Sequence, residues 1–379
     1  QEILFASRAL QGAFGALLTP AALSLINVTF TIPKERARAF GVYGAISGGG
    51  AAIGLILGGA LTEFTSWRWC LWVNVPIAII AVFLAFPFVH ESKAGGEHSY
   101  DLPGTVTATL GLLSLVYGFT KAAQDGWATA STLNYFGIAG ILLVAFFLIE
   151  KNVKNPLLPL RIITERNRGG SYLGSMMVGA GLFSMFLFLG LYLQVILGYS
   201  PLKTGFAFLP FSIGIILFAG VASQLLPKVG PKPLIIWGLI QSTFGLFLLS
   251  FITPETSYAT HVLPSLIIMS TGMALVFIPI STTALHGIGG RDSGVASAAL
   301  NTSQQVGGSL GTALLNTIAA TSAANYLINN PGLGDKANTF ALTHGYTASF
   351  KAGAVMLIVG AIVMMVFIKV GKESLVEKD

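Results

Sequence analysis

The sequence predicts an all-helical integral membrane protein with about eleven transmembrane helices. Two observations predict this class. Of the 379 residues, 54% are hydrophobic, only 9% are charged, and the mean hydropathy is +0.76, whereas soluble domains carry about 25% charged residues. Apolar stretches long enough to cross a bilayer, about 18 to 25 residues each, also recur along the whole chain.

The predicted spans follow from these apolar stretches, each ended by charges, prolines or a polar cluster. The first five lie near residues 4–26, 39–62, 70–89, 103–122 and 133–150. Six more lie near residues 170–197, 204–226, 233–252, 263–285, 294–319 and 347–370. The stretch 151–168 is too broken by Pro156 and Pro159 to span, and we expect it at the membrane surface.

The basic residues predict the orientation. When the spans are threaded alternately through a bilayer, fifteen of the 21 Lys and Arg residues fall on one side. Cytoplasmic loops carry the excess of basic residues in membrane proteins. We therefore expect a multi-pass protein of the cell membrane with a cytoplasmic C-terminus.

The grouping of the spans predicts three parts. Residues 1–90 hold three spans, 91–168 hold a polar linker, two spans and a basic loop, and 169–379 hold six spans. The odd number of spans, the initial Gln1 and the missing initiator methionine indicate an N-terminally truncated fragment that lacks three spans. The grouping then indicates the end of one six-helix half, a two-helix insert and a second half.

Arg8 is the one ionisable residue that lies firmly inside a predicted span. A charge there costs several kcal/mol and normally faces a cavity or a partner. Gln11, Gly12, Gly15 and Thr19 follow at helical spacing, so one helix face is polar. We expect this face to line an aqueous cavity; the alternative is that Arg8 extends to the outer headgroups.

A second polar face lies in the span near residues 294–319. Its members, at helical spacing, are Asn301, Gln304, Gln305, Gly308 and Thr312. We expect it to line a substrate cavity; the alternative is interhelical hydrogen bonding that only holds the bundle together. Weaker candidates for the same cavity are Tyr192, Gln194 and Gln241.

Eight glycines lie between Gly41 and Gly59 in an uncharged apolar stretch. A glycine inside a helix costs about 1 kcal/mol relative to alanine. So many glycines therefore indicate a helix that another backbone approaches closely, or one that bends. We expect the second half of the protein to supply that neighbour.

Soluble-enzyme chemistry is nearly absent from the sequence. The five histidines show no metal-ligand spacing, no HExxH or CxxC motif occurs, and Cys70 is the only cysteine. No clustered basic face indicates nucleic-acid binding. The chain also has no G-x-x-x-x-G-K-[ST] loop for ATP, so we expect no enzyme, metal or cofactor, and an ion gradient as the energy source for uphill transport.

Several of these residues resemble the major facilitator superfamily, specifically its fourteen-span drug/proton antiporters. Arg8-Ala9-Leu10-Gln11-Gly12 is similar to the proton-coupling motif of that branch's fourth span. The antiporter motif of the fifth span is matched at Gly41, Gly50, Gly54, Gly58 and Gly59. Leu55 stands where the family usually has proline, which departs from the kink that the motif implies.

Three further segments resemble the same branch. They are Ser66–Trp69 with Asn74–Pro76, Tyr192–Gln194 through Gly198–Pro201 to Pro210, and Asn301–Gly308. The resemblance implies a major facilitator fold with about eleven of fourteen spans present. It also implies that the proton-carrying carboxylate lies in absent N-terminal spans, near Arg8.

The resemblance implies an exporter of hydrophobic drugs or antibiotics in exchange for protons. Its partners would be a small hydrophobic substrate, protons and the lipid bilayer, and the protein is expected to be a monomer. An exporter dedicated to one endogenous metabolite is the alternative. A membrane-embedded transferase and a passive channel are further alternatives from other functional classes.

Overall fold

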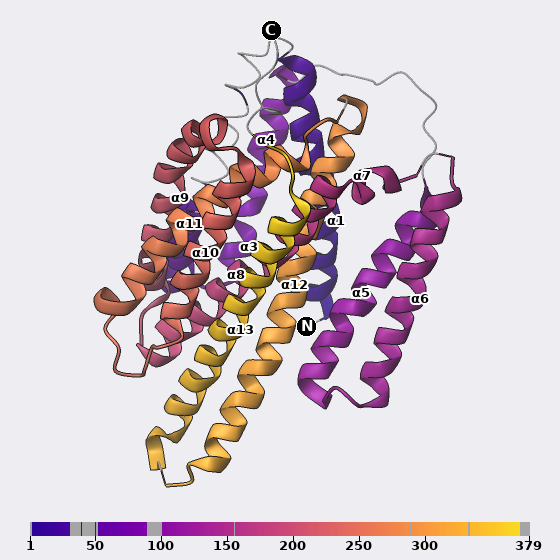
Figure 1. The fold of residues 1–379 in the computed structure, drawn as a ribbon. Helices are drawn as coiled ribbons and strands as arrows, with labels where there is room; N and C mark the ends of the chain where they lie inside the picture. Colours follow the sequence, from indigo (N-terminus) through magenta and orange to yellow (C-terminus); the bar gives the residue numbers. More distant parts are fainter. Residues whose placement is uncertain are drawn as a thin grey trace.

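The computed structural model describes residues 2–30, 39, 50, 52–88, 101–154, 156–288, 290–332 and 334–371. Within these ranges the chain forms helices, turns and connecting loops, and no strand (Figure 1). The long helices are α1 (Glu2–Thr29), α4 (Asn74–Phe88), α5 (Leu102–Asp125), α6 (Ala130–Asn152), α8 (Arg166–Leu191), α9 (Pro201–Val229), α10 (Pro231–Leu249), α11 (Leu263–Ala284), α12 (Gly290–Asn329) and α13 (Ala337–Phe367). The short elements are the helical segment Ala52–Phe64, α3 (Trp69–Trp72), α7 (Leu160–Thr164), the π-helical turns η1 (Tyr192–Ile196) and η2 (Tyr258–Val262), and the 3-10 turn η3 (Gly334–Lys336).

Eight helices of the described part are long and apolar enough to cross a membrane. They are Trp69–Phe88, Leu102–Ala122, Ala130–Asn152, Arg166–Ile196, Pro201–Val229, Pro231–Leu249, Tyr258–Ala284 and Ala337–Phe367. With 28 and 40 residues, α1 and α12 also exceed the length of about 20 residues that a span needs. The all-helical membrane class is confirmed, and the number of eleven crossings stays a prediction.

The last two helices differ from the sequence prediction in length. The prediction ended one span at residue 319 and began the next at 347, whereas α12 continues to Asn329 and α13 begins at Ala337. Residues 319–324 include four alanines, the residue with the highest helix propensity. The end of the apolar stretch is therefore not the end of the helix.

The hydrophobic core lies in the six long helices after residue 165. Its largest fully buried side chains include Tyr192, Phe188, Phe350 and Met185. Helix α8 packs against α12 and α13, and α10 packs against α11. Helices α5 and α6 form a hairpin beside this group, and α5 packs against α12 (Figure 1).

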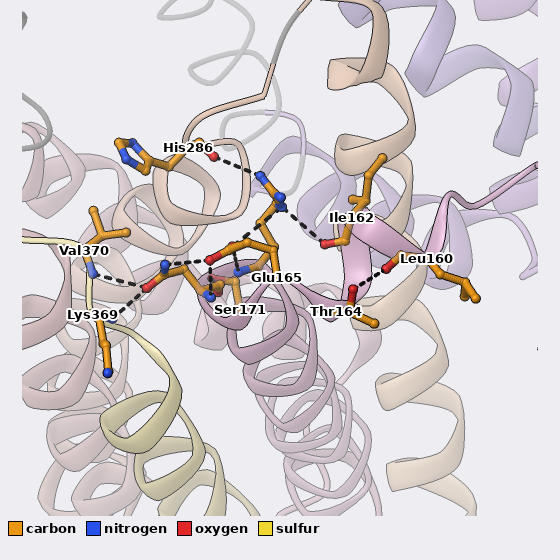
Figure 2. A network of polar contacts seen from close by, with 10 residues as sticks. Leu160, Ile162, Thr164, Glu165, Ser171, His286, Lys369 and Val370 are labelled. Atoms are coloured by element: carbon orange, nitrogen blue, oxygen red, sulfur yellow. Dashed lines mark hydrogen bonds and ion pairs between the residues drawn. The ribbon is translucent and has the colours of Figure 1, made fainter. Parts of the chain in front are cut away.

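Side-chain caps and long-range hydrogen bonds fix one end of the bundle, here called the α7 end (Figure 2). Glu165 caps α8 by accepting hydrogen bonds from the backbone N–H groups of Asn167 and Arg168, at 3.0 and 2.9 Å. The Arg168 guanidinium donates to the carbonyl groups of Ile162 and His286, each at 3.2 Å. These bonds join α7 and the end of α11 to the start of α8.

The same end is tied to the C-terminal helix and to α12. The side-chain carbonyl of Asn167 accepts hydrogen bonds from the backbone N–H groups of Lys369 and Val370, at 2.6 and 3.2 Å. Arg161 forms an ion pair with Asp292 at 2.8 Å. The opposite end, where α12 and α13 are joined, is called the hairpin end below.

Candidate functional site

Helices α8 and α12 approach each other at glycines. A side chain at Gly307 would overlap the backbone of Met176, and one at Gly179 would overlap the backbone of Gln304. Such contact requires residues without a side chain, as in other membrane helix pairs. The contact sets the rotation of α12 and therefore decides which of its polar residues face a cavity.

A cavity of about 540 Å³ lies between α5, α8 and α12, and we call it the polar cavity. Its lining residues are Val116, Thr120, Gln124, Phe183, Leu187, Gly308, Ser309, Thr312, Ala313 and Asn316. Hydroxyl and amide groups from two helices thus face apolar side chains of α8. Such a lining can hydrogen-bond a ligand while it buries apolar surface.

The polar cavity includes only part of the predicted polar face of α12. Gly308 and Thr312 line it, whereas Asn301 and Gln305 are exposed and Gln304 is half-buried outside it. The cavity continues along the helix to Asn316. The prediction of a polar face was useful, but the cavity is shifted toward the hairpin end.

Gln124 is a cavity residue that the sequence interpretation missed. It lies one turn after Thr120 on α5, and both line the polar cavity. The signal in the sequence was this pair of polar residues at i and i+4 in an apolar span. Only the packing of α5 on α12 shows what the pair faces.

A second cavity, of about 850 Å³, lies near the α7 end and is called the apolar cavity. It is lined by residues of α5, α6, the segment 157–164, α8, α12 and Phe367. The Tyr172 side chain, 5% exposed, borders it, and the Tyr172 hydroxyl has no hydrogen-bond partner within the described ranges. The cavity therefore offers a large apolar surface together with the hydroxyl groups of Tyr172, Thr302 and Ser303.

A third cavity, of about 360 Å³, brings together two groups that the sequence singled out separately. The glycine-rich helix contributes Gly54, Leu55, Gly58 and Gly59, and η1 contributes Gln194. The remaining walls come from Thr62, from Cys70 of α3, and from residues of α8 and α9. We call it the glycine cavity.

Close backbone contact beside the glycine cavity depends on Gly59 and on Gly205 of α9. A Cβ atom on Gly59 would lie 2.7 Å from the carbonyl oxygen of Pro201, and one on Gly205 would lie 2.5 Å from that of Leu55. Both distances are shorter than any normal contact. The expected approach of the second half thus occurs at this end of the glycine-rich stretch.

The other glycines of the stretch are not in such contact. A Cβ atom on Gly50, Gly54 or Gly58 would meet no atom within 4 Å among the described residues. Among the described glycines of the stretch, Gly59 makes the close contact, and a packing role for the whole series stays a prediction. Gly41 lies outside the described residues.

Polar contacts support the same interface at the hairpin end. The carboxylate of Glu63 accepts a hydrogen bond from the backbone N–H of Leu202 at 3.0 Å, in the first turn of α9. An anionic group at a helix N-terminus is stabilised by the helix dipole. Glu63 therefore has a structural partner in the second half.

Two of the weaker cavity candidates have other roles. Tyr192 is fully buried, and its hydroxyl donates to the carbonyl oxygen of Thr253 at 2.8 Å. The amide of Gln241 donates to the hydroxyl of Thr271, which joins α10 to α11. Neither residue lines any of the three cavities, and their place in a substrate cavity stays a prediction.

Arg8 and Gln11 are hydrogen-bonded to each other on α1. The Arg8 guanidinium donates to the side-chain oxygen of Gln11 at 2.6 Å, and both side chains are exposed. A side chain at Gly12 would meet no atom within 4 Å in the described part of the chain. The structure thus has the polar pair on one helix face, away from the three cavities.

The sequence is similar to those of several known drug and antibiotic transport or resistance proteins. The chain is 43% identical over 368 residues to puromycin resistance protein pur8 of Streptomyces alboniger. This alignment covers 96% of this chain and 73% of that protein. It is 34% identical over 326 residues to cephamycin export protein CmcT of Amycolatopsis lactamdurans, with 85% and 67% covered. It is 30% identical over 324 residues to multidrug transporter protein MdtP of Bacillus subtilis, with 84% and 59% covered.

The fold resembles a bacterial homologue of the human lysosomal transporter Spinster, solved in an inward-facing and occupied conformation. The TM-score is 0.55 at 16% sequence identity, over 94% of this chain and 74% of that one. At this identity the likeness concerns the fold alone. Residues 1–312 match the sequence profile of the Major Facilitator Superfamily, and the chain therefore belongs to this family of membrane transporters and is not an enzyme.

Proposed function

We propose that this protein exports hydrophobic drugs or antibiotics across the membrane in exchange for protons. The observation that carries the proposal is the similarity, over nearly the whole chain, to the puromycin resistance protein. The multidrug transporter and the cephamycin export protein support it at lower identity. A dedicated transporter of one endogenous compound is the second candidate, because two of these relatives are each named for a single antibiotic.

The cavities fit a hydrophobic cargo. The apolar cavity of about 850 Å³ has the size of a site for a drug-like molecule, for which typical volumes are about 300–1,000 Å³. The polar cavity supplies hydrogen-bonding groups from α5 and α12. We assign substrate contact to both cavities, with Gln124, Thr312 and Asn316 as the orienting groups.

Proton coupling is assigned to the Arg8, Gln11 and Gly12 group. The sequence contains no nucleotide-binding loop of the Walker type, so a gradient is the natural energy source. The bond between Arg8 and Gln11 holds the guanidinium in a fixed orientation. The positive charge would lower the pKa of a carboxylate placed beside it and so favour release of its proton.

The proposed architecture is that of the fourteen-span branch. Residues 1–90 supply the last three spans of the N-terminal half, 91–168 the linker with two inserted spans and a cytoplasmic loop, and 169–379 the six-span C-terminal half. Gly41, Gly50, Gly54, Leu55, Gly58 and Gly59 form the antiporter motif in this proposal. Substrate and protons cross within one copy, so a monomer suffices.

Everted membrane vesicles test the function. In vesicles from cells that express the natural gene, a proton gradient should drive uptake of puromycin, and nigericin should abolish that uptake. Uptake that continues without the gradient would indicate a passive channel. A panel of unrelated hydrophobic drugs separates the two candidates, because a dedicated exporter would accept one of them at most.

The coupling assignment has its own test. Arg8→Lys keeps the charge but loses the planar fork that binds Gln11. We expect gradient-driven uptake to fall at least tenfold while the amount of protein in the membrane stays the same. Normal uptake by Arg8→Ala would contradict the assignment and leave Arg8 as a headgroup contact.

A further inference from the structure

Two buried carboxyl groups meet at the α7 end of the α5–α6 hairpin. Asp101, 8% exposed, caps α5 and accepts a hydrogen bond from the backbone N–H of Gly104 at 2.8 Å. Glu150, 3% exposed, lies in the last turn of α6 and accepts from the backbone N–H of Leu158 at 3.0 Å. Each carboxyl group thus has one oxygen that is satisfied by the backbone.

The other oxygen of each group has no hydrogen-bond donor. Oδ2 of Asp101 and Oε1 of Glu150 are both buried and unpartnered in the part of the chain that the structure describes. Both oxygens converge on the Cα atom of Gly104, since a Cβ atom there would overlap Oδ2 and lie 2.9 Å from Oε1. The absence of a side chain at Gly104 therefore lets the two carboxyl groups face each other.

Two buried carboxyl groups whose unpartnered oxygens meet beside Gly104 repel each other strongly when both are ionised, because the surrounding medium has a low dielectric. A proton on one of them removes the repulsion and also supplies the missing donor. We propose that Asp101 and Glu150 form a proton-binding site, in which the Oε1–H of Glu150 donates to Oδ2 of Asp101. The site is separate from the Arg8 group and goes beyond the proposed export function.

The helix dipoles decide which group carries the proton. Asp101 lies at the N-terminus of α5, where a negative charge is stabilised, and Glu150 lies at the C-terminus of α6, where it is destabilised. Among the described residues, the linker adds the backbone N–H groups of Leu157 and Leu158. Lys151 and Lys154, the nearest cations in the sequence, are exposed, so Asp101 is the charge that Glu150 faces.

This proton site joins the α5–α6 hairpin to the segment that leads into the second half of the protein. Glu150 holds Leu158, and Leu157 and Leu158 both line the apolar cavity. When the proton leaves, two charges face each other at this junction and push α5 and α6 apart. The site therefore makes one wall of the apolar cavity sensitive to pH.

Infrared spectroscopy of the purified protein in lipid tests the proton directly. At pH 7 we expect a carbonyl band from a buried protonated carboxyl group, absent in Glu150→Gln and shifted in Asp101→Asn. Thermal unfolding gives an independent readout. Glu150→Gln should keep the wild-type midpoint at pH 7, because its amide also donates to Asp101, and should remain stable at alkaline pH where the wild type loses stability.

Two variants serve as controls. Glu150→Ala leaves Asp101 without a donor, and its unfolding midpoint should fall by several degrees. Glu165→Gln changes an acidic residue whose two carboxylate oxygens both accept hydrogen bonds from N–H groups. A glutamine amide group would replace one of these acceptors with a donor, so the variant should be destabilised at pH 7, unlike Glu150→Gln. A wild-type spectrum without the carbonyl band, or a Glu150→Gln midpoint as low as that of Glu150→Ala, would overturn the proposal.

Discussion

Asn316 and Asn301 are two asparagines on α12, about four turns apart, and only Asn316 borders the polar cavity. Asn316→Leu removes a hydrogen-bonding group from a site that binds substrate in our proposal. A net hydrogen bond contributes about 1 kcal/mol, so we expect the apparent affinity for substrate to fall about fivefold. Concentration-dependent uptake in vesicles measures it.

Asn301→Leu is the matched control, because it makes the same chemical change on the same helix at a position that does not line the polar cavity. It should leave the concentration dependence of uptake unchanged. Equal losses in the two variants would show that the asparagines act on the helix and not on the substrate.

The helix cap formed by Glu165 predicts that the α7 end loses folding stability at acidic pH. Partial burial alone would raise the pKa of Glu165, but hydrogen bonds from the backbone N–H groups of Asn167 and Arg168 outweigh it, and the pKa lies below its usual value. A lowered pKa stabilises the folded state above the pKa of the unfolded chain, and this stabilisation is lost as the pH falls through the lower folded value. The thermal unfolding midpoint should therefore fall when the pH is lowered below about 4.5, the usual pKa of a glutamate side chain.

Glu165→Gln isolates this effect. The variant should be less stable at neutral pH by about 1 kcal/mol, the usual cost of a lost helix cap, and its midpoint should change less with pH in the acidic range. An acid transition of the same size in the variant would assign the loss of stability to other carboxyl groups.

Single residues show where sequence reasoning is informative and where it stops. Arg8 and Gln11 are three positions apart, and helical geometry alone predicts that their side chains meet, as they do. Tyr192 and Gln241 are polar residues in apolar spans, and the sequence cannot tell a cavity residue from one whose hydrogen bond lies inside the bundle. Their partners, Thr253 and Thr271, are distant in sequence and known only from the packing.

At the scale of helices, Gly59 and Gly54 provide a matched pair. Leucine at Gly59 would collide with the backbone of Pro201 and Leu202, which cannot move without displacing α9. We expect Gly59→Leu to cost about 1–3 kcal/mol of stability and to impair transport. In the described part of the chain, a Cβ atom on Gly54 would meet no atom within 4 Å, so Gly54→Leu should be much milder.

The unfolding midpoint in detergent and the rate of uptake measure both glycine variants. Equally severe defects would show that the helix packs along its whole glycine series, with partners beyond the described residues. Two normal variants would show that the contact with α9 does not matter for folding or transport.

Helices were predictable from hydropathy because each span must bury about 20 apolar residues in lipid. All eleven predicted spans overlap helices of the structure, as far as their residues are described. Helix ends were less predictable, as α12 shows, because alanines continue a helix after the apolar requirement ends. The rotation of each helix depends on its neighbours, and hydropathy carries no information about that.

For the whole molecule, the distribution of basic residues predicts which end faces the cytoplasm. Single cysteines in a Cys70→Ser background test this at exposed positions. Lys154→Cys and Lys228→Cys at the α7 end should react only with a membrane-permeant thiol reagent in intact cells. Ala128→Cys and Ser257→Cys at the opposite end should react with an impermeant one, and the reverse pattern would overturn both the orientation and the export direction.

The arrangement of the whole molecule was only partly predictable. The insert could be recognised as two apolar spans between groups of three and six. Its packing on α12, which brings Gln124 and Asn316 into one cavity, could not. Contacts between helices that are far apart in sequence depend on how their side-chain surfaces fit together. No local sequence pattern reveals which helices will pack in this way.

The long pair α12 and α13 has a practical consequence for imaging. A helix of 40 residues is about 60 Å long, whereas the bilayer with its headgroups is about 40–45 Å thick. The helix is therefore longer than the bilayer is thick, and the joined ends of α12 and α13 extend past the neighbouring helices (Figure 1). An antibody fragment raised against this projection would give each particle an asymmetric landmark for alignment in electron micrographs.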